Sequence, residues 1–280
     1  MLYFFRHKAD QWSILTVGVL LLIRVVVFVE SSWWALLWAP ALAFVLLPVM
    51  AIKHNHVHLP ICRSRQANIV VDQALNLITG STMSGIRIVH LLNHHQHIDG
   101  PDDWGNTQLT SPSNTRTAFG WYVLRTPYAF ARALGNWRRA HGDHPVTRRL
   151  KRENIALLGT YALLTAIDPP AGLLTILLPN ILLQHFLVAF NFIQHYGCDP
   201  LSDNDHSRNI TGRWFNIFAF NAGLHTAHHH HPGLHWSELA AAFGRISAQI
   251  NTRLNHKGLW EVLGLILTNR LPLPGFKPPA

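Results

Sequence analysis

The stretch WWALLWAPALAFVLLPVMAIKHNHVH, residues 33–58, sets an uncharged apolar run directly before a group of histidines. Its apolar part, 33–52, carries no charge and has about the 20 residues that a helix needs to cross a bilayer. The histidines begin at His54, so we expect them where this helix leaves the membrane. The stretch therefore predicts a membrane protein whose chemistry lies at the membrane surface.

The composition separates this chain from ordinary soluble domains. Of its 280 residues, 49% are apolar and 13% are charged, whereas about a quarter of the residues of a soluble domain carry a charge. The formal net charge is +9, an excess that anionic lipid, nucleic acid or an acidic partner could balance. The positions of the charges along the chain decide among these partners.

The apolar runs predict an all-α integral membrane protein with four transmembrane helices in two hairpins. The hairpin turns are expected at Glu30-Ser31-Ser32 and at Asp168-Pro169-Pro170, and Asn154 is expected to cap the third helix. We treat residues 1–280 as one domain. The predicted spans cover about 13–30, 33–52, 154–168 and 171–193.

The positive charges predict the orientation of these helices. Thirteen Lys and Arg residues lie in 53–153 and seven in 194–280, whereas the two hairpin turns carry none. By the positive-inside rule, both termini and these two long segments are cytoplasmic, where they form a helical cap. Anionic lipid then explains the excess charge better than nucleic acid does, since the sequence has no interleaved aromatic and basic readout motif.

Within the first cap segment, residues 67–79 and 86–98 read as helices with one polar and one apolar face, broken at 80–85. They are expected to lie on the membrane surface. Asp102, Asp103 and Trp104 could contact a substrate head group, but turn chemistry alone explains two Asp residues after Pro101, so we favour a turn. Arg24, inside the first span, is expected to be paired or to reach the interface.

Histidine is unusually frequent, with 20 in the chain, and most are clustered. The clusters are HNHVH at 54–58, HLLNHHQH at 90–97 and HTAHHHH at 225–231, and His195 ends the fourth predicted span. All four positions fall on the cytoplasmic side of the topology predicted from charge. Hydropathy and charge thus bring the histidines to one plane without any assumption about their role.

Helical spacing puts members of each cluster on a common face, because residues three or four apart are neighbours on a helix. In the first cluster His56 then points away from the other two histidines. In the second, His95 is adjacent to the shared face. The groups with this spacing are His54 with His58, His90 with His94, and His225 with His228 and His229.

Metal binding is the chemistry that such clusters serve. Imidazole suits iron, zinc, copper and nickel, and nine histidines exceed the ligands of one ion, so two metals are expected. A structural zinc site would favour four ligands, often Cys, and the HExxH pattern of zinc proteases is missing from the sequence. The Glu-x-x-His pairs of soluble di-iron bundles are missing as well.

The clusters HNHVH, HLLNHHQH and HTAHHHHPGLHW (225–236), with FNFIQHYG (190–197) between the last two, resemble the histidine boxes of the membrane fatty-acid desaturase superfamily. The resemblance extends over roughly residues 33–240. It implies a non-haem di-iron centre that uses O2 as co-substrate. The ligands it implies are His54, His58, His90, His94, His95, His195, His225, His228 and His229.

Other polar residues lie beside these nine. His230 and His231 allow other registers of the third cluster, and the same holds for the extra histidines of the first two. We predict that four further residues lie around the ligands, where such an outer group orients a ligand or a metal-bound water. They are Asn221, His97, His56 and Asn191.

The resemblance implies an oxidoreductase that attacks an unactivated C–H bond of a fatty acyl or related lipid chain. Desaturation is the leading hypothesis, and hydroxylation or alkene-forming decarboxylation on the same scaffold are alternatives. The substrate could be an acyl-CoA, an acyl-carrier protein, a phospholipid or a free acid. The electrons would come from a separate ferredoxin- or rubredoxin-like protein.

A non-enzymatic membrane protein that binds or transports a metal is the alternative from another class. Transport would require polar groups along a path through the spans. Only Arg24, Asn180, Gln184 and His185 offer such groups, which are too few to line a route. We therefore favour the enzyme.

Overall fold

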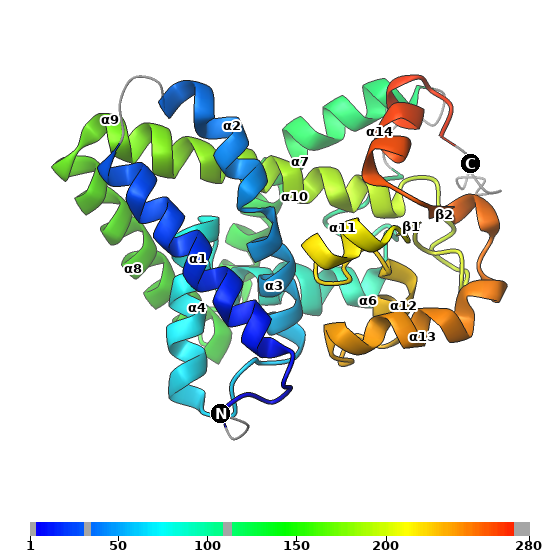
Figure 1. The fold of residues 1–280 in the computed structure, drawn as a ribbon, viewed down its shortest axis with the longest axis horizontal. Helices are drawn as coiled ribbons and strands as arrows, with labels where there is room; N and C mark the ends of the chain where they lie inside the picture. The colour runs from blue at the N-terminus through cyan, green and yellow to red at the C-terminus, as the bar shows by residue number, and fades with distance from the viewer. Residues whose placement is uncertain (1–3, 31–34, 109–113, 272–280) are drawn as a thin grey trace. The chain divides into compact units, whose positions relative to one another are not determined.

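The computed structural model describes residues 4–30, 35–108 and 114–271, and the chain is mostly helical (Figure 1). Residues 31–34, which hold part of the first predicted hairpin turn and the start of the second predicted span, lie outside the described residues. The chain forms two compact units. The first comprises Met1–Ile88 and Leu134–Gln184, and the second comprises Val89–Ala133 and His185–Ala280.

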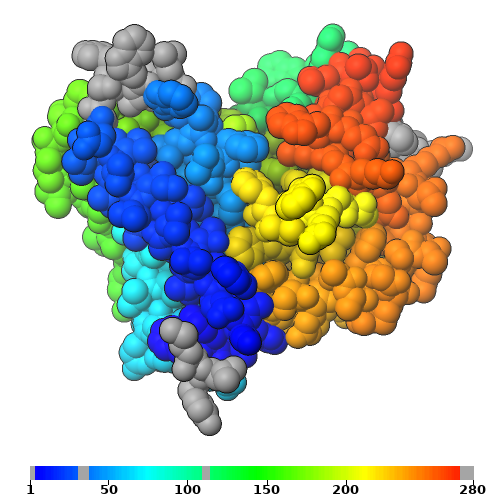
Figure 2. All heavy atoms as spheres, viewed as in Figure 1, coloured from blue at the N-terminus to red at the C-terminus, as the bar shows by residue number. Residues whose placement is uncertain are grey.

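The first unit is built from the apolar helices and the segments that connect them. Its helices are α1 (Asp10–Val29), α2 (Ala35–Val45), α3 (Leu47–His58), α4 (Arg65–Thr79), α5 (Met83–Ile86), α8 (Pro145–Ile167), α9 (Pro169–Ala171), the π-helix η2 (Gly172–Leu177) and the start of α10 (Leu178–His195). Helix α1 runs along the surface of this unit (Figure 2). Most of its exposed side chains are apolar, which suits contact with lipid, and they include Trp12, Leu15, Leu22 and Val29.

Three helical stretches are long and apolar enough to cross a membrane: Asp10–Val29, Trp38–His58 and Pro169–His195. The second predicted span is interrupted near Leu46, where α2 ends and α3 begins, because Pro48 has no N–H for a continuous helix. Helix α8 is not among the three. It begins at Pro145 with His144 as its cap, so the predicted cap at Asn154 is wrong.

Arg24 of α1 is buried and hydrogen-bonded within the first unit, which answers the question of its partner. Its guanidinium donates to the Asn180 side-chain oxygen at 2.9 Å, to the Ile176 carbonyl at 2.9 Å and to the Ile78 carbonyl. Ile176 lies in the π-helix η2, and π-helical bonding is common where a helix serves a special contact. Arg24 thus ties three segments of the unit together.

Gly80 ends α4 with a left-handed φ of 71°, at the helix break predicted for 80–85. A Cβ at this position would lie 2.7 Å from the Cβ of Asn180, closer than side chains approach. Glycine therefore allows both the turn and the close packing of α4 on α10.

The second unit holds the end of α10 and several further helices. These are the π-helix η1 (Arg87–His94, entered from the first unit), α6 (His95–His97), α7 (Thr115–Ala140, which continues into the first unit), α11 (Arg213–Phe218), α12 (His225–His230), η3 (Trp236–Glu238), α13 (Leu239–Ile246), η4 (Ser247–Gln249), η5 (Thr252–Leu254) and α14 (Leu259–Leu267). The strands β1 (Asn209–Ile210) and β2 (Asn255–His256) pair in parallel, a small departure from the all-α prediction. The core of this unit packs α7, α10 and α14 together, with Tyr122, Phe192, Tyr196 and Ile266 among its buried side chains.

We expect Arg24→Met to destabilise the protein by about 3 kcal/mol, because it leaves Asn180 and two buried carbonyls without their donor. The measurement is the unfolding temperature of the purified protein in detergent. Arg138→Met, at an exposed position, is the matched control. Equal unfolding temperatures for the two variants would show that the Arg24 contacts add nothing.

Candidate metal centre

The second histidine cluster lies at the end of η1, whose π-helical winding differs from the α-helix expected from the sequence. In a π-helix, residues five apart approach each other. Accordingly, the Nε2 atoms of His90 and His95 lie 3.1 Å apart. His94 was predicted to share a helix face with His90, but its ring nitrogens belong to a different group.

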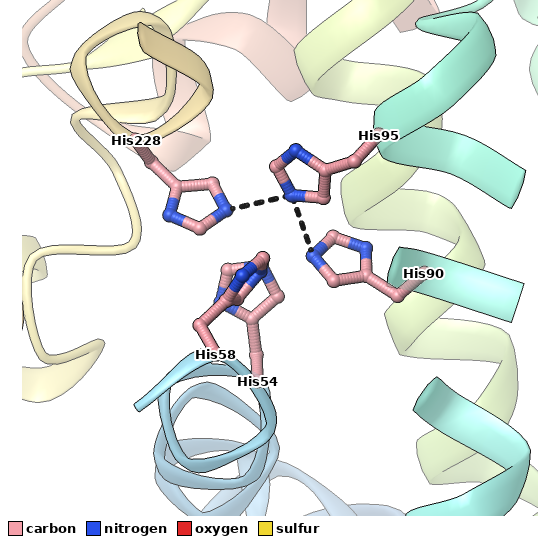
Figure 3. Close-up of side chains that lie close together, drawn as sticks. All are labelled: His54, His58, His90, His95 and His228. Carbon is pink, nitrogen blue, oxygen red and sulfur yellow. Dashed lines mark hydrogen bonds between the residues drawn. The ribbon is translucent and has the colours of Figure 1, made fainter. Parts of the chain in front are cut away.

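A first histidine group in the second unit consists of His90, His95 and His228. His95 Nε2 lies 3.1 Å from His90 Nε2 and 3.2 Å from His228 Nε2. Figure 3 shows these three rings pointing toward one another from η1, α6 and α12. The group thus joins two clusters that are far apart in the sequence.

A second group consists of His94, His195, His225 and His229, which lie wholly within the second unit. Each offers a ring nitrogen within 4.8 Å of the others, and all four side chains are buried. His225 Nε2 lies 2.9 Å from His195 Nε2 and 3.1 Å from His229 Nε2. The third cluster is therefore divided, because His228 belongs to the first group.

These distances fit ligation of a cation better than hydrogen bonding among the rings. A neutral imidazole has one N–H, so three Nε2 atoms that meet at one point cannot all be satisfied by protons. Two nitrogens held about 2.1 Å from one metal at about 90° lie about 3 Å apart, as these pairs do. The histidines thus present a donor set that fits two metal ions.

Hydrogen bonds at Nδ1 hold two of the second-group rings in the orientation that such ligation needs. His94 donates from Nδ1 to the Asp103 carboxylate at 2.7 Å, and His195 donates from Nδ1 to the His206 carbonyl at 3.1 Å. Each bond leaves the Nε2 lone pair facing the group. Carboxylates and carbonyls behind metal-bound histidines have this role in other proteins.

The Asp103 carboxylate is held in place by hydrogen bonds from the backbone of its own loop. It accepts hydrogen bonds from the backbone N–H groups of Asp99 and Gly105, both at 2.8 Å. Asn191 holds the same loop by donating to the Gly105 carbonyl at 3.0 Å and to Tyr122 at 2.6 Å. The loop thus provides the turn predicted around Asp103, and the carboxylate has a contact that the sequence analysis missed.

Burial and the Asp103 carboxylate act in opposite directions on the pKa values of the second group. Burial lowers the pKa of His229 well below its usual value, and His225 and His94 add to this effect, so its ring stays neutral. For His94, burial acts to lower the pKa, but the nearby Asp103 carboxylate raises it overall. Burial acts to raise the pKa of Asp103, yet the pairing with His94 holds it well below its usual range.

Helix α12 is positioned by the segment that leads into β1. Thr226, next to His225, donates its backbone N–H to the Asn209 side chain at 3.0 Å, and its hydroxyl accepts from the Asn209 amide at 3.0 Å. The buried Arg208 donates to the Ile193 carbonyl at 2.8 Å, near the end of α10. These contacts set His225 beside His195.

Comparison with known proteins now bears on this geometry. The family model described as fatty acid desaturase matches residues 31–257. The chain belongs to the fatty acid desaturase family. No curated protein matches it significantly. Members of this family are membrane-bound oxidoreductases that modify lipids and use iron, and the histidine groups of this desaturase-family protein can bind metal.

The first cluster of this desaturase-family protein lies in the first unit, on the last turns of α3. The rings of His54 and His58 leave the same side of the helix, with centroids 5.3 Å apart (Figure 3). His56 instead has its Nε2 3.0 Å from Asp72 Oδ1, and its Nδ1 accepts from the Ile61 N–H at 3.0 Å. Both nitrogens of His56 are thus engaged by protein groups.

The other predicted supporting residues differ in their surroundings. Asn191 braces the loop of Asp103, as described above. Asn221 has a left-handed φ of 59° in a turn before α12, and its amide donates to the Trp236 carbonyl at 2.8 Å. His97 is exposed. Of the four, Asn191 is the one whose hydrogen bonds lead, through Gly105 and Asp103, to a histidine of the second group.

We expect Asp103→Asn to weaken metal binding about 10- to 100-fold, because the amide orients His94 less firmly and removes a buried negative charge. The measurement is iron retention against a competing chelator. Asp102→Asn is the matched control, because Asp102 is exposed and adjacent. Retention that falls equally in both variants would contradict the role of Asp103.

Proposed function

We propose that this protein is an O2-dependent di-iron oxidoreductase that desaturates a fatty acyl or related lipid chain. The observation that supports it most directly is the convergence of seven imidazoles into two groups in a member of the fatty acid desaturase family. Two separate groups suit two metals. Imidazole donors suit iron as they suit zinc, copper and nickel, and the use of iron in this family favours iron here. We favour desaturation among the possible reactions, because the pattern of histidine boxes resembles that of desaturases most closely.

The proposed ligand set divides between two irons. His94, His195, His225 and His229 would hold one ion. His90, His95 and His228 would hold the other, and three nitrogens leave that ion short of the four to six ligands that it prefers. We assign His54 and His58 to complete this group, since their rings share one side of α3.

When bound, the two irons would supply the activation of O2 that allows hydrogen to be removed from an unactivated C–H bond. The protein's own part is to hold Nε2 lone pairs at fixed positions. Asp103 and the His206 carbonyl keep the Nδ1 protons of His94 and His195 away from the centre. Burial of the second group excludes water that would otherwise compete for the metal.

The substrate and partners of the proposed reaction follow from its chemistry. The lipid chain would enter between the apolar helices, and its head would be an acyl-CoA, acyl-carrier protein, phospholipid or free acid. A ferredoxin- or rubredoxin-like protein would deliver the electrons. The proposed topology has four spans, with α8 as the third, and places 53–153 and 194–280 in a cytoplasmic cap.

We expect wild-type protein to carry two irons per chain and to form a new double bond in a host supplied with ferredoxin and reductase. His94→Ala and His228→Ala each remove one proposed ligand, one from each group, and should lower product by about 100-fold or more. The measurements are iron content and lipid and acid profiling. His141→Ala, at an exposed histidine outside the clusters, should retain both iron and activity.

Different products would identify other reactions on this scaffold. A new hydroxyl group or a shortened terminal alkene would contradict desaturation while preserving the di-iron proposal. One zinc or copper ion per chain, with no uptake of O2, would overturn the proposal as a whole. Activity that survives either ligand substitution would refute the ligand assignment.

The proposed topology predicts that the two ends of α8 are labelled from opposite sides of the membrane. An impermeant maleimide should reach Pro170→Cys in intact cells and Asp143→Cys, just before the start of α8, only after the membrane is opened, since both positions are exposed. The native Cys62 and Cys198 are buried, which keeps the background low. Labelling of both variants from one side would rule out α8 as a span.

A further inference from the structure

A cavity of about 610 Å³ in the first unit is lined by an unusual excess of arginine. Such a volume is within the range of sites for small ligands, about 300–1,000 Å³. Two carboxylates, Asp72 and Glu153, line it as well. The arginines that line it, called the arginine pocket below, are Arg6, Arg63, Arg65, Arg87, Arg149 and Arg152.

The two carboxylates are already engaged and do not balance the other arginines. Arg149 pairs with Asp72 and, at 2.7 Å, with Glu153. Asp72 also meets His56, and Glu153 accepts the Ser84 N–H at 2.8 Å. Within the described part of the chain, the remaining five arginines of the pocket form no ion pair with a carboxylate.

Two helices hold this positive charge in place. Arg65, Ile69 and Asp72 follow each other at intervals of three or four residues along α4, so they share one face. Arg149, Arg152 and Ala156 do the same along α8. Both helices thus present a stripe to the cavity, and they carry three of its six arginines.

Like charges are forced together in the pocket. Arg87 is half-buried, and burial, followed by the charge of Arg149, lowers its pKa. A bound anion would relieve this repulsion. Guanidinium groups match phosphate oxygens in charge and in geometry, so phosphate is the anion that such a cluster prefers.

The pocket lies where a lipid head group would be found. The Arg6 N–H donates to the Ile61 carbonyl at 2.9 Å, which joins the segment before α1 to the segment after α3. The pocket is therefore at the ends of two candidate membrane spans. Trp12, at the start of α1, is exposed as residues at a membrane interface often are.

Apolar surface next to the pocket offers a place for acyl chains. Ile69 lines the cavity and is 46% exposed, and Val70 beside it on α4 is 69% exposed. A free phosphate would gain nothing from these side chains, whereas a lipid would cover them. We propose that the arginine pocket binds the phosphate head group of an anionic membrane lipid, with the phosphomonoester of phosphatidic acid as the best match to its charge.

The test uses delipidated full-length protein in detergent, titrated with dioctanoyl phosphatidic acid while its unfolding temperature is followed. We expect a saturable rise in that temperature, and native mass spectrometry should show one bound lipid. The double variant Arg65→Gln/Arg152→Gln should bind about tenfold more weakly, since each arginine removed takes away charged hydrogen bonds. Both positions are exposed, so the variant should fold.

Matched controls separate this site from general attraction to charge. Arg138→Gln removes one exposed positive charge outside the pocket and should bind like wild type. A second double variant, Arg6→Gln/Arg63→Gln, should repeat the loss if the first one unfolds. Dioctanoyl phosphatidylcholine should raise the unfolding temperature little, because its head group carries no net charge.

Three results would overturn the proposal. Binding to phosphatidic acid that is unchanged in both double variants would place the lipid elsewhere. Equal stabilisation by phosphatidylcholine would show that the acyl chains alone are responsible. Equal stabilisation by inorganic phosphate at the same concentration would make this a site for free phosphate. None of these measurements depends on iron or on activity.

Discussion

Imidazole nitrogens that face one another at about 3 Å repel unless a cation or a shared proton lies between them, and this constraint governs the second unit. Rings brought this close must be held from behind. Asp103 and the His206 carbonyl do so for two rings, and the protein buries the second group to keep water out. The loop around Asp103, the braces from Asn191 and the contacts that seat α12 all serve this requirement.

Helix geometry distributes the histidines between the two groups. A regular α-helix would put His90 and His94 on one side, whereas the π-helix η1 brings His90 to His95 and releases His94 to the second group. In the third cluster, His228 turns to one group while its neighbour His229 turns to the other. Adjacent residues can thus join different groups because their side chains leave a helix in different directions.

The first unit contains two different arrangements of arginine, one inside an apolar helix and one in a pocket. Arg24, inside an apolar helix, is accommodated because three acceptors surround its guanidinium. The arginine pocket does the opposite, since it concentrates positive charge at the ends of two candidate spans with too few carboxylates to balance it. The Arg24 guanidinium is hydrogen-bonded within the protein, whereas the arginine pocket leaves positive charge available to an anion outside the chain.

The sequence by itself determined the family, the helical character and the histidine clusters, because hydropathy and residue spacing are local properties. It also predicted the break near Gly80, where a turn needs glycine. The tertiary structure decided which histidines meet, because that depends on the winding of η1 and on segments distant in the chain. Asp103 looked like an ordinary turn residue until the fold set it 2.7 Å from His94. The partners of Arg24 and the arginine pocket were equally beyond the sequence, since they join residues from separate helices that only packing brings together.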